Sequence, residues 1–417
     1  MPHSAFDRLP KHLTISFPLW QIFGTPGAYS PYYDIDRCIR EHAERGFNCI
    51  RIESGAGLIH DLAGNPRPPL DVTDMFGRFE LVPRQQHVTG DGGSCDLLAR
   101  LVETCESAKR HGVFLILSSW YYLHTYWYHK ANDPICDELF AIPPHERFAA
   151  FANFWHYILK ELEARGLDDT IAFVEICNEC NDHPYLNGHG NHGASKRLDP
   201  EETAHFREEH EAALAFLKRE HPQLLFAYDT SSPPREDGCI PSNADVYNFH
   251  SYYLWSIYNE VADAHPEWFR GEITPAAVER SREGRRPVSP DWYERVARFN
   301  DLDMRYLPDF EAELEKKLAE NLPKYVERFD RQLAFAKQHA GNRPIVCGEG
   351  VSYICHKELL WEEHSDAYWE LVLEGIQKYK EAGLWGTVIR TCCGTEDPSW
   401  TLCRDRLLAC NRLFLGD

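Results

Sequence analysis

The chain has 417 residues, of which 43% are hydrophobic and 13% aromatic, so it can bury a sizeable core. Acidic residues outnumber basic ones by 65 to 44, which gives a formal net charge of −21. That charge argues against a nucleic-acid partner, because phosphate binding needs a basic surface, and against an anionic membrane surface.

The first residues, MPHSAFDRLPKHLTISF, lack the charged start, the apolar run and the small-residue cleavage site of a signal peptide. The sequence contains no stretch of about 18 apolar residues, so no membrane-spanning helix is expected. The 14 cysteines are scattered along the chain and are not spaced like a disulfide scaffold. We therefore expect a cytoplasmic protein with reduced thiols.

Short apolar runs rich in Val, Ile and Phe alternate with longer helical patterns along the chain. Runs of this kind are typical of strands that are buried on both faces of a parallel sheet. The runs predict eight strands, at residues 12–20, 49–54, 113–120, 171–179, 225–230, 246–253, 344–350 and 386–392.

Eight strands joined by helices predict a (β/α)8 TIM barrel, and we expect residues 1–417 to form a single domain. The alternative is an open doubly wound sheet, which the lack of a G-x-G-x-x-G motif after an early strand weakens. The stretch 309–340 contains Pro323 and predicts two helices or one kinked helix. The gap 231–245 has no obvious helix. Other helices are predicted at 34–45, 95–112, 145–166 and 201–221.

Two connections between a strand and the next helix are too long to be plain loops. They run from about 55 to 94 and from about 254 to 308, and both follow strand C-termini, where barrel enzymes build their sites. The second contains Trp255 among several aromatic residues. We expect both insertions to lie at the catalytic face and to close part of the cleft, which favours exo action.

Three predicted strands end in polar residues: the fourth in EICNE (175–179), the sixth in HSYY (250–253) and the seventh in GEG (348–350). A buried strand that ends at a carboxylate is unfavourable unless the carboxylate has a partner or a function. Glu179 and Glu349 would both point into the barrel mouth. Cleavage of a glycosidic bond needs such a pair, one carboxylic acid for the leaving oxygen and one carboxylate on the opposite face of the sugar.

These segments resemble the strand motifs of clan A glycoside hydrolases, the (β/α)8 group that includes cellulases and β-mannanases. IAFVEICNE (171–179) is similar to the strand-four segment, PIVCGEG (344–350) to the strand-seven nucleophile segment and GFNCIRIES (46–54) to strand two. His250 and Tyr252 are similar to the histidine and aromatic positions of strand six. The chain looks closest to cellulase-like members of the clan, similar to glycoside hydrolase family 5.

The resemblance implies a retaining β-glycosidase that hydrolyses O-glycosidic bonds by double displacement. Glu179 is then the general acid/base and Glu349 the nucleophile, with carboxyl groups about 5–5.5 Å apart. Arg51 would keep Glu349 ionised, because a nearby cation lowers the pKa of a carboxylate. Asn178 would hydrogen-bond the sugar 2-hydroxyl, and Tyr252 would hydrogen-bond Glu349.

Further residues are candidates for carbohydrate contact because of their place at strand ends and in loops. Glu175 lies within a strand and is expected to support the site without taking part in the reaction. Clan members offer a strand-eight tryptophan as a floor for the sugar, but this chain has IRTCC (389–393), so Arg390 or Trp400 is expected to take that place. The candidates for carbohydrate contact are Trp20, Trp120, His124, His250, Trp255 and Arg390.

Two alternatives of other classes stay open. His183, His189 and His192 follow the fourth strand and could ligate a metal in a metal-dependent barrel hydrolase. Cys177 and Cys180 form a lone C-x-x-C, which argues little for zinc. The second alternative is a non-catalytic sugar-binding barrel, which the altered strand eight favours. We expect no metal and no cofactor, and oligosaccharides or small glycosides as substrates, with the sugar, the linkage and the oligomeric state open.

Overall fold

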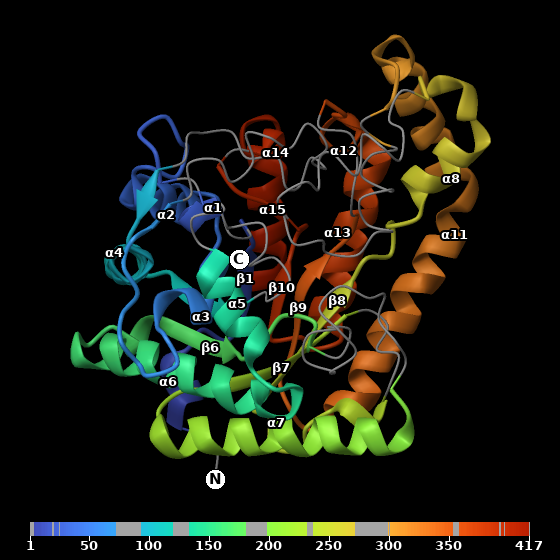
Figure 1. Ribbon diagram of the computed structural model, residues 1–417. Coiled ribbons are helices and arrows are strands. Elements are labelled where there is room, and N and C mark those ends of the chain that lie inside the picture. Colours follow the sequence, from blue (N-terminus) through green and yellow to red (C-terminus); the bar gives the residue numbers. More distant parts are fainter. Residues whose placement is uncertain are drawn as a thin grey trace.

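The structure is a computed structural model, shown in Figure 1. The residues that it describes are 4–18, 21–24, 26–71, 93–119, 133–180, 198–231, 237–271, 299, 301–352, 358–391, 393–395 and 397–416.

Eight parallel strands close into a barrel, in the order β1-β10-β9-β8-β7-β6-β5-β2. This confirms the predicted (β/α)8 barrel and rules out the open doubly wound sheet. A separate antiparallel pair, β3 (Leu70–Asp71) with β4 (Ser94–Cys95), lies within the first long connection. The barrel strands are β1 (Leu13–Ser16), β2 (Cys49–Glu53), β5 (Phe114–Ser118), β6 (Ile171–Glu175), β7 (Phe226–Thr230), β8 (Val246–Ser251), β9 (Ile345–Gly350) and β10 (Gly386–Val388).

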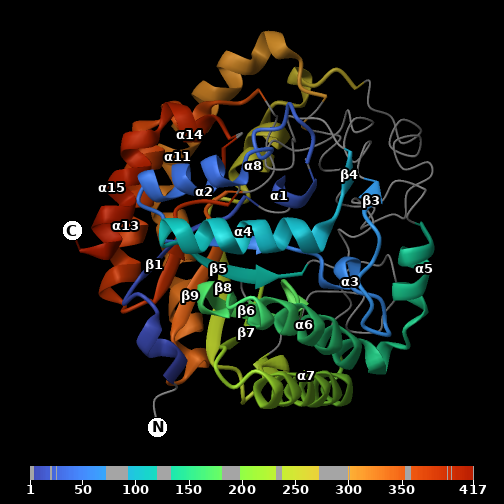
Figure 2. The same cartoon turned by 90° about the vertical axis from the view of Figure 1, so that its left-hand side faces the viewer.

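Helices surround the barrel, and Figure 2 shows α4 beside α2 and α6 beside α7. Short 3-10 helices include η1 (Ser4–Arg8), η5 (Pro144–Glu146) and η6 (Asp168–Thr170). The helices are α1 (Gln21–Gly24), α2 (Ile35–Glu44), α3 (Ala56–Ile59), α4 (Leu97–His111), α5 (Asp133–Ala141), α6 (Arg147–Ala164), α7 (Pro200–Glu220), α8 (Ile257–Ala264), α11 (Leu307–Ala340), α12 (Trp361–His364), α13 (Asp366–Glu381), α14 (Pro398–Leu402) and α15 (Arg404–Leu415).

Local sequence signals set the ends of these helices. The Asp96 side chain caps α4 by accepting a hydrogen bond from the amide of Ala99, and Gly112 ends that helix in a left-handed conformation with φ 64°. Asp199 and Glu202 form a capping box at the start of α7. Such residues satisfy backbone groups that the helix itself leaves without partners.

Pro323 does not divide its segment into two helices. The structure has one helix, α11, of 34 residues, so the two-helix expectation is wrong. An interior proline destabilises a helix by about 3 kcal/mol. The buried face of α11 continues on both sides of the proline, through Leu314, Leu318, Tyr325 and Phe329, and packs against α8 and α13 (Figure 1). We infer that this packing outweighs the proline.

The two long connections contain structure of their own. The first holds α3 and β3, and the second holds α8 with the short helices η9 (Pro266–Trp268) and η10 (Met304–Tyr306). In the gap 231–245, the described residues form only the short helix η8 (Asp237–Cys239). Within the described part of the chain, no helix has both the length and the apolar character that a membrane span requires.

Candidate active site

Arg51 on β2 is the centre of a hydrogen-bond network at the C-terminal ends of the barrel strands. Its side chain is fully buried. Nη1 donates to Oε1 of Glu349 at 2.7 Å, and Nη2 donates to Oε2 of Glu175 at 2.7 Å. Nη2 also donates to Oδ1 of Asn178 at 2.5 Å, and Oδ2 of Asp229 lies 3.4 Å away. One guanidinium therefore joins strands β2, β6, β7 and β9.

Eleven side chains at this end of the barrel meet at Arg51 or are joined to it through one another. We call them the Arg51 group. The group is Arg51, Glu53, Glu175, Asn178, Glu179, Asp229, Asn248, His250, Tyr252, Glu349 and Thr391.

Glu179 lies in the turn that follows β6, and its φ is 46°. A left-handed backbone is uncommon for a residue other than glycine. Its amide donates to Oδ1 of Asp229 at 2.5 Å, and its Oε1 lies 2.7 Å from Nδ1 of His250. About one fifth of its side chain is exposed, whereas Asp229 and His250 are fully buried. Glu179 is thus held in a strained but fixed turn at the open side of the network.

His250 on β8 bridges the acidic side chains. Its Nε2 lies 3.1 Å from Oδ2 of Asp229 and 3.5 Å from Oε1 of Glu349. Burial by itself lowers the pKa of His250, but the charges of Asp229 and Glu349 and the hydrogen bonds to Asp229 and Glu179 raise it well above its usual value. The imidazole is therefore positively charged, and both ring nitrogens can donate.

Glu349 ends up opposite His250 because of a register shift. The pairing of β8 with β9 is irregular between Phe249 and His250, and this places His250 beside Glu349. Gly348, just before Glu349, has no room for a Cβ atom, which would overlap the Asn248 side chain. Asn248 in turn donates to Oε1 of Glu175 at 2.7 Å. Gly348 therefore leaves room for the Asn248 side chain in the position from which it bonds Glu175.

Two cations act on the Glu349 carboxylate, but burial has the larger effect on its pKa. Burial raises the pKa, and the charges of His250 and Arg51 lower it without offsetting the rise. Asp229 behaves in the opposite way, because His250 and Arg51 overcome its burial and lower its pKa. The expectation that Arg51 favours an ionised Glu349 is right in direction, but it is only one of the contributions.

Tyr252 and Thr391 form a chain of hydrogen bonds that ends on Glu349. The Tyr252 hydroxyl donates to Oε2 of Glu349, as the sequence predicts. Oγ1 of Thr391 lies 3.1 Å from that hydroxyl and accepts from the amide of Gly350 at 2.8 Å. Because the single phenolic proton of Tyr252 goes to the carboxylate, the Thr391 hydroxyl must donate to the Tyr252 oxygen.

The structure brings together six of the predicted site residues: Arg51, Asn178, Glu179, His250, Tyr252 and Glu349. The predictions for Trp20, Trp120 and His124, and for His183, His189 and His192, fall on residues outside the described ones.

Of the Arg51 group, sequence reasoning missed Glu53, Asp229, Asn248 and Thr391. A signal existed for the first three, because CIRIES, LFAYDT and VYNFHS each place a polar residue inside an apolar strand. That pattern had already indicated Glu175 and Glu349. No such signal exists for Thr391, which follows the end of β10.

Trp255 lies in the turn after β8 and is not in the Arg51 group. Its side chain is 45% exposed, and the guanidinium of Arg328 lies 5.8 Å from its ring centroid. Trp400 on α14 is buried against Arg45, with 4.1 Å between guanidinium and ring centroid, and its Nε1 donates to Glu41. Trp400 therefore packs against α2 and is not the floor that the sequence predicts, while carbohydrate contact by the exposed Trp255 stays a prediction.

Arg390 belongs to a second buried cluster. Its Nη2 lies 2.6 Å from Oε2 of Glu362, and its Nη1 donates to Oε1 of Glu363 at 2.8 Å. Asp397 lies 3.8 Å away, and Glu362 also accepts hydrogen bonds from Tyr258 and Ser352. We call Arg390, Glu362, Glu363 and Asp397 the Arg390 group. It ties α12 to the segment after β10, and it does not place Arg390 beneath a sugar.

Two further features bear on metal and thiol chemistry. One ligand atom from each of Glu179, His250 and Glu349 lies within 4.8 Å of the others, a spacing that a metal ion could also use. Cys177 and Cys180 are buried, and Sγ of Cys180 donates to the carbonyl oxygen of Asp229 at 3.4 Å. Both thiols are therefore part of the buried packing, and that of Cys180 contacts the backbone of Asp229.

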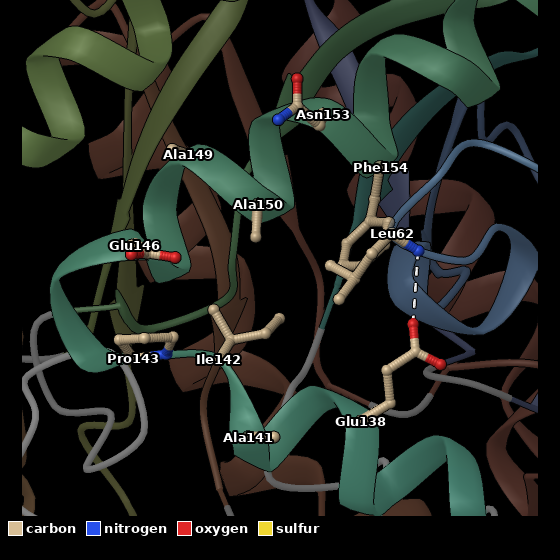
Figure 3. A pocket seen from close by; sticks show the side chains of 10 residues that line it. All are labelled: Leu62, Glu138, Ala141, Ile142, Pro143, Glu146, Ala149, Ala150, Asn153 and Phe154. Carbon is tan, nitrogen blue, oxygen red and sulfur yellow. Dashed lines mark hydrogen bonds between the residues drawn. The ribbon is translucent and has the colours of Figure 1, made fainter.

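A hollow of about 430 Å³ lies between α5 and α6 on the outside of the barrel (Figure 3). Its walls are mostly apolar, and Glu138 at its edge accepts a hydrogen bond from the Leu62 amide at 3.3 Å. None of its lining residues belongs to the Arg51 group. It is therefore a surface feature separate from the barrel mouth.

Comparisons with known proteins agree with this architecture. Residues 25–400 match the sequence model of the cellulase-like family, which is described as sugar-binding cellulase-like. A solved structure from Parabacteroides distasonis, assigned as a glycoside hydrolase, is 19% identical with a TM-score of 0.66, over 97% of this chain and 94% of that chain. This likeness supports the fold.

Two other solved structures cover nearly the whole chain at lower similarity. A glycoside hydrolase family 5 enzyme from Prevotella bryantii is 12% identical with a TM-score of 0.49, over 98% of each chain. A broad-specificity endoglucanase from Clostridium longisporum is 12% identical with a TM-score of 0.49, over 99% of each chain. No match was found among curated proteins.

Proposed function

The chain belongs to the cellulase-like family, and from that premise we propose that it is a retaining β-glycosidase acting by double displacement. The resemblance to cellulase-like members of clan A rests on the strand motifs and on this family match. Glu349 is the nucleophile and Glu179 the general acid/base. The substrates are oligosaccharides or small glycosides.

One observation carries the proposal: a carboxylate oxygen of Glu179 and one of Glu349 lie within 4.8 Å of each other. Retaining enzymes hold their carboxyl groups about 5–5.5 Å apart, and inverting enzymes hold them about 6.5–9.5 Å apart to admit a water molecule. The closeness of the two oxygens therefore favours attack by Glu349 itself over attack by a water.

The surroundings of the two carboxylates suit different roles. Each carboxylate oxygen of Glu349 accepts one hydrogen bond, Oε1 from Arg51 and Oε2 from Tyr252, and both bonds favour the ionised form that attacks the anomeric carbon, against the effect of burial. Glu179 is partly exposed, where it can give a proton to the leaving oxygen and later take one from water. Asn178 accepts from Arg51 through Oδ1, and its Nδ2, which has no hydrogen-bond partner among the described residues, can donate to the sugar 2-hydroxyl.

Turnover of a panel of aryl β-glycosides tests the proposal. We expect hydrolysis by the unmodified chain, and its loss in Glu349→Gln and Glu179→Gln. The surface substitution Glu44→Gln on α2 serves as the matched control and leaves turnover unchanged. Turnover that survives Glu349→Gln contradicts the assignment of the nucleophile.

Two further measurements separate the mechanisms. A 2-deoxy-2-fluoro aryl glycoside traps a glycosyl-enzyme intermediate, so we expect mass spectrometry to find the added sugar on the peptide that contains Glu349. The first product should have the β configuration by NMR. Loss of turnover with a chelator and recovery with a divalent ion would favour a metal held by Glu179, His250 and Glu349. Sugar binding without any turnover would favour the non-catalytic barrel.

A further inference from the structure

Glu53 is a buried carboxylate at the barrel mouth for which the proposed mechanism has no use. It is the last residue of β2, two positions after Arg51, so both side chains lie on the same face of the strand. Its side chain is fully buried. Among the residues that the structure describes, neither of its carboxylate oxygens has a hydrogen-bond partner.

The nearest cation does not satisfy Glu53. Nη2 of Arg51 lies 3.7 Å from Oε1 of Glu53, which is too long for a hydrogen bond. That nitrogen carries two hydrogens, and its short contacts go to Glu175 and Asn178. Arg51 therefore has no hydrogen left on Nη2 for Glu53.

Asn178 presents a second polar atom of this kind beside Arg51. Its Oδ1 accepts from Nη2 of Arg51, but its buried Nδ2 has no hydrogen-bond partner among the described residues. Native proteins rarely leave buried donors and acceptors in this condition without a reason. Glu53 and Asn178 thus lie beside the same guanidinium nitrogen, Nη2, while Nη1 of that guanidinium contacts Glu349.

The chemistry of these atoms matches a neutral sugar better than a charged group. A sugar hydroxyl both donates and accepts, so one hydroxyl oxygen can accept from Nδ2 of Asn178 while another donates to Glu53. An anion is disfavoured by the surrounding carboxylates, and a cation by the outward hydrogens of the amide. Burial also raises the pKa of Glu53 well above its usual value, which leaves its carboxyl able to donate as well as accept.

We propose that Glu53 binds a hydroxyl group of the glycone next to the hydroxyl that Asn178 binds, and so selects the sugar that the enzyme accepts. The inference rests on the proposed function of the same site. It has a consequence for stability, because a buried polar group without a partner destabilises the fold. Replacing Glu53 by an apolar residue of similar size should therefore keep or raise stability while it weakens sugar binding.

The test measures binding and stability together on the full chain, without relying on turnover. The probes are methyl β-D-glucoside, methyl β-D-mannoside and methyl β-D-galactoside, and the readouts are the Tm without sugar and the Kd from calorimetry. The chain and its Glu53→Met and Glu53→Gln variants are compared. Glu362→Met is the matched control, since Glu362 is another buried glutamate but is paired with Arg390.

For Glu53→Met we expect an unchanged or higher Tm and a Kd about 10- to 100-fold weaker for the glycoside that binds best. Glu53→Gln keeps hydrogen-bonding atoms, so its Kd should lie between those of the unmodified chain and Glu53→Met. Glu362→Met should lower the Tm and leave the Kd unchanged. A lower Tm with an unchanged Kd in Glu53→Met overturns the inference, and so does the failure of all three glycosides to bind the unmodified chain.

The outcomes also separate this inference from the proposed function. If hydrolysis depends on Glu349 but the Kd is the same in the Glu53 variants, the glycosidase proposal stands and the role of Glu53 is contradicted. Binding that depends on Glu53, in a chain that hydrolyses no glycoside, supports the glycone contact and contradicts the glycosidase.

Discussion

The molecule contains two buried arginines that each gather several carboxylates, and their difference is instructive. In the Arg390 group, Glu362 and Glu363 lie within 2.8 Å of the guanidinium, and all members are almost fully buried. In the Arg51 group, about one fifth of the Glu179 side chain is exposed. A buried arginine with acidic neighbours is therefore not in itself an active site. What distinguishes the Arg51 group is that one of its carboxylates, Glu179, reaches solvent, whereas the carboxylates of the Arg390 group are buried.

The largest expected effect is on turnover, and it separates the two groups. Glu179→Gln should lower kcat/KM by about 10²- to 10⁴-fold on substrates with poor leaving groups, because general acid catalysis contributes on that scale. Substrates with good leaving groups need less protonation and should lose less. Glu363→Gln in the Arg390 group should leave kcat/KM close to that of the unmodified chain. Equal losses in the two variants would contradict the separation.

The next effect is on stability, and here the Arg390 group should be more sensitive to substitution than the Arg51 group. Arg390→Met leaves Glu362 and Glu363 buried without their cation, and breaking a buried ion pair from one side destabilises a protein by about 3–5 kcal/mol. Urea unfolding followed by circular dichroism measures it. Glu179→Gln, at a partly exposed position, should change the free energy of unfolding by much less. A stable Arg390→Met variant would show that the Arg390 group is dispensable.

Two buried histidines extend the comparison to pH. His250 lies among carboxylates that keep it charged. His42 is buried with 4.5 Å between its ring centroid and that of Trp400, and no carboxylate among the described residues raises its pKa. Burial lowers the pKa of His42 to about 4. The stabilisation from the neutral ring is complete above the unfolded value of 6.5 and is lost as the pH falls through about 4.

That loss is on the order of 3 kcal/mol between pH 6.5 and 4, from about 1.36 kcal/mol per unit of pKa difference. His42→Phe keeps the ring and removes the titration, so urea unfolding of this variant should depend less steeply on pH in that range. A slope equal to that of the unmodified chain would count against the effect. The charged His250 has the opposite sign, since its stabilisation is lost only as the pH rises through its raised pKa.

The smallest effect concerns Thr391. Thr391→Val removes the hydrogen bond that the hydroxyl donates to Tyr252, which should lower kcat/KM by about 3- to 10-fold, the size of one hydrogen bond. Thr391→Ser should restore the value. In a Tyr252→Phe background the Thr391→Val change should add nothing, because Thr391 acts through the phenol. Independent losses would assign Thr391 a purely structural role.

The barrel could be read from the sequence because its signal is long and periodic. Eight apolar runs, separated by helical patterns with stop signals such as Gly112, leave few other folds possible. Glu179 and Glu349 could also be found, since charged residues at the ends of buried strands stand out. The same reasoning applied to strand β7 would also have indicated Asp229.

The end of strand eight could not be read in this way. β10 stops at Val388, and beyond it the alternation of side chains between the two faces no longer holds. Arg390 and Thr391 are adjacent, yet one pairs with Glu362 and the other with Tyr252. Which of two neighbours turns toward the site is decided by partners more than 25 residues away in the sequence. The two-helix interpretation of 309–340 fails for a similar reason, because the packing that keeps α11 one helix comes from α8 and α13.

The left-handed backbone of Glu179 has a consequence for the history of such a protein. A left-handed conformation disfavours any residue with a Cβ atom by roughly 1–2 kcal/mol, and glycine is free of that penalty. Selection for heat resistance alone would therefore replace Glu179 with glycine. A relative that keeps glutamate at this position is therefore under selection for the function of the carboxylate. The residue found there in each relative would indicate whether that relative retains this function.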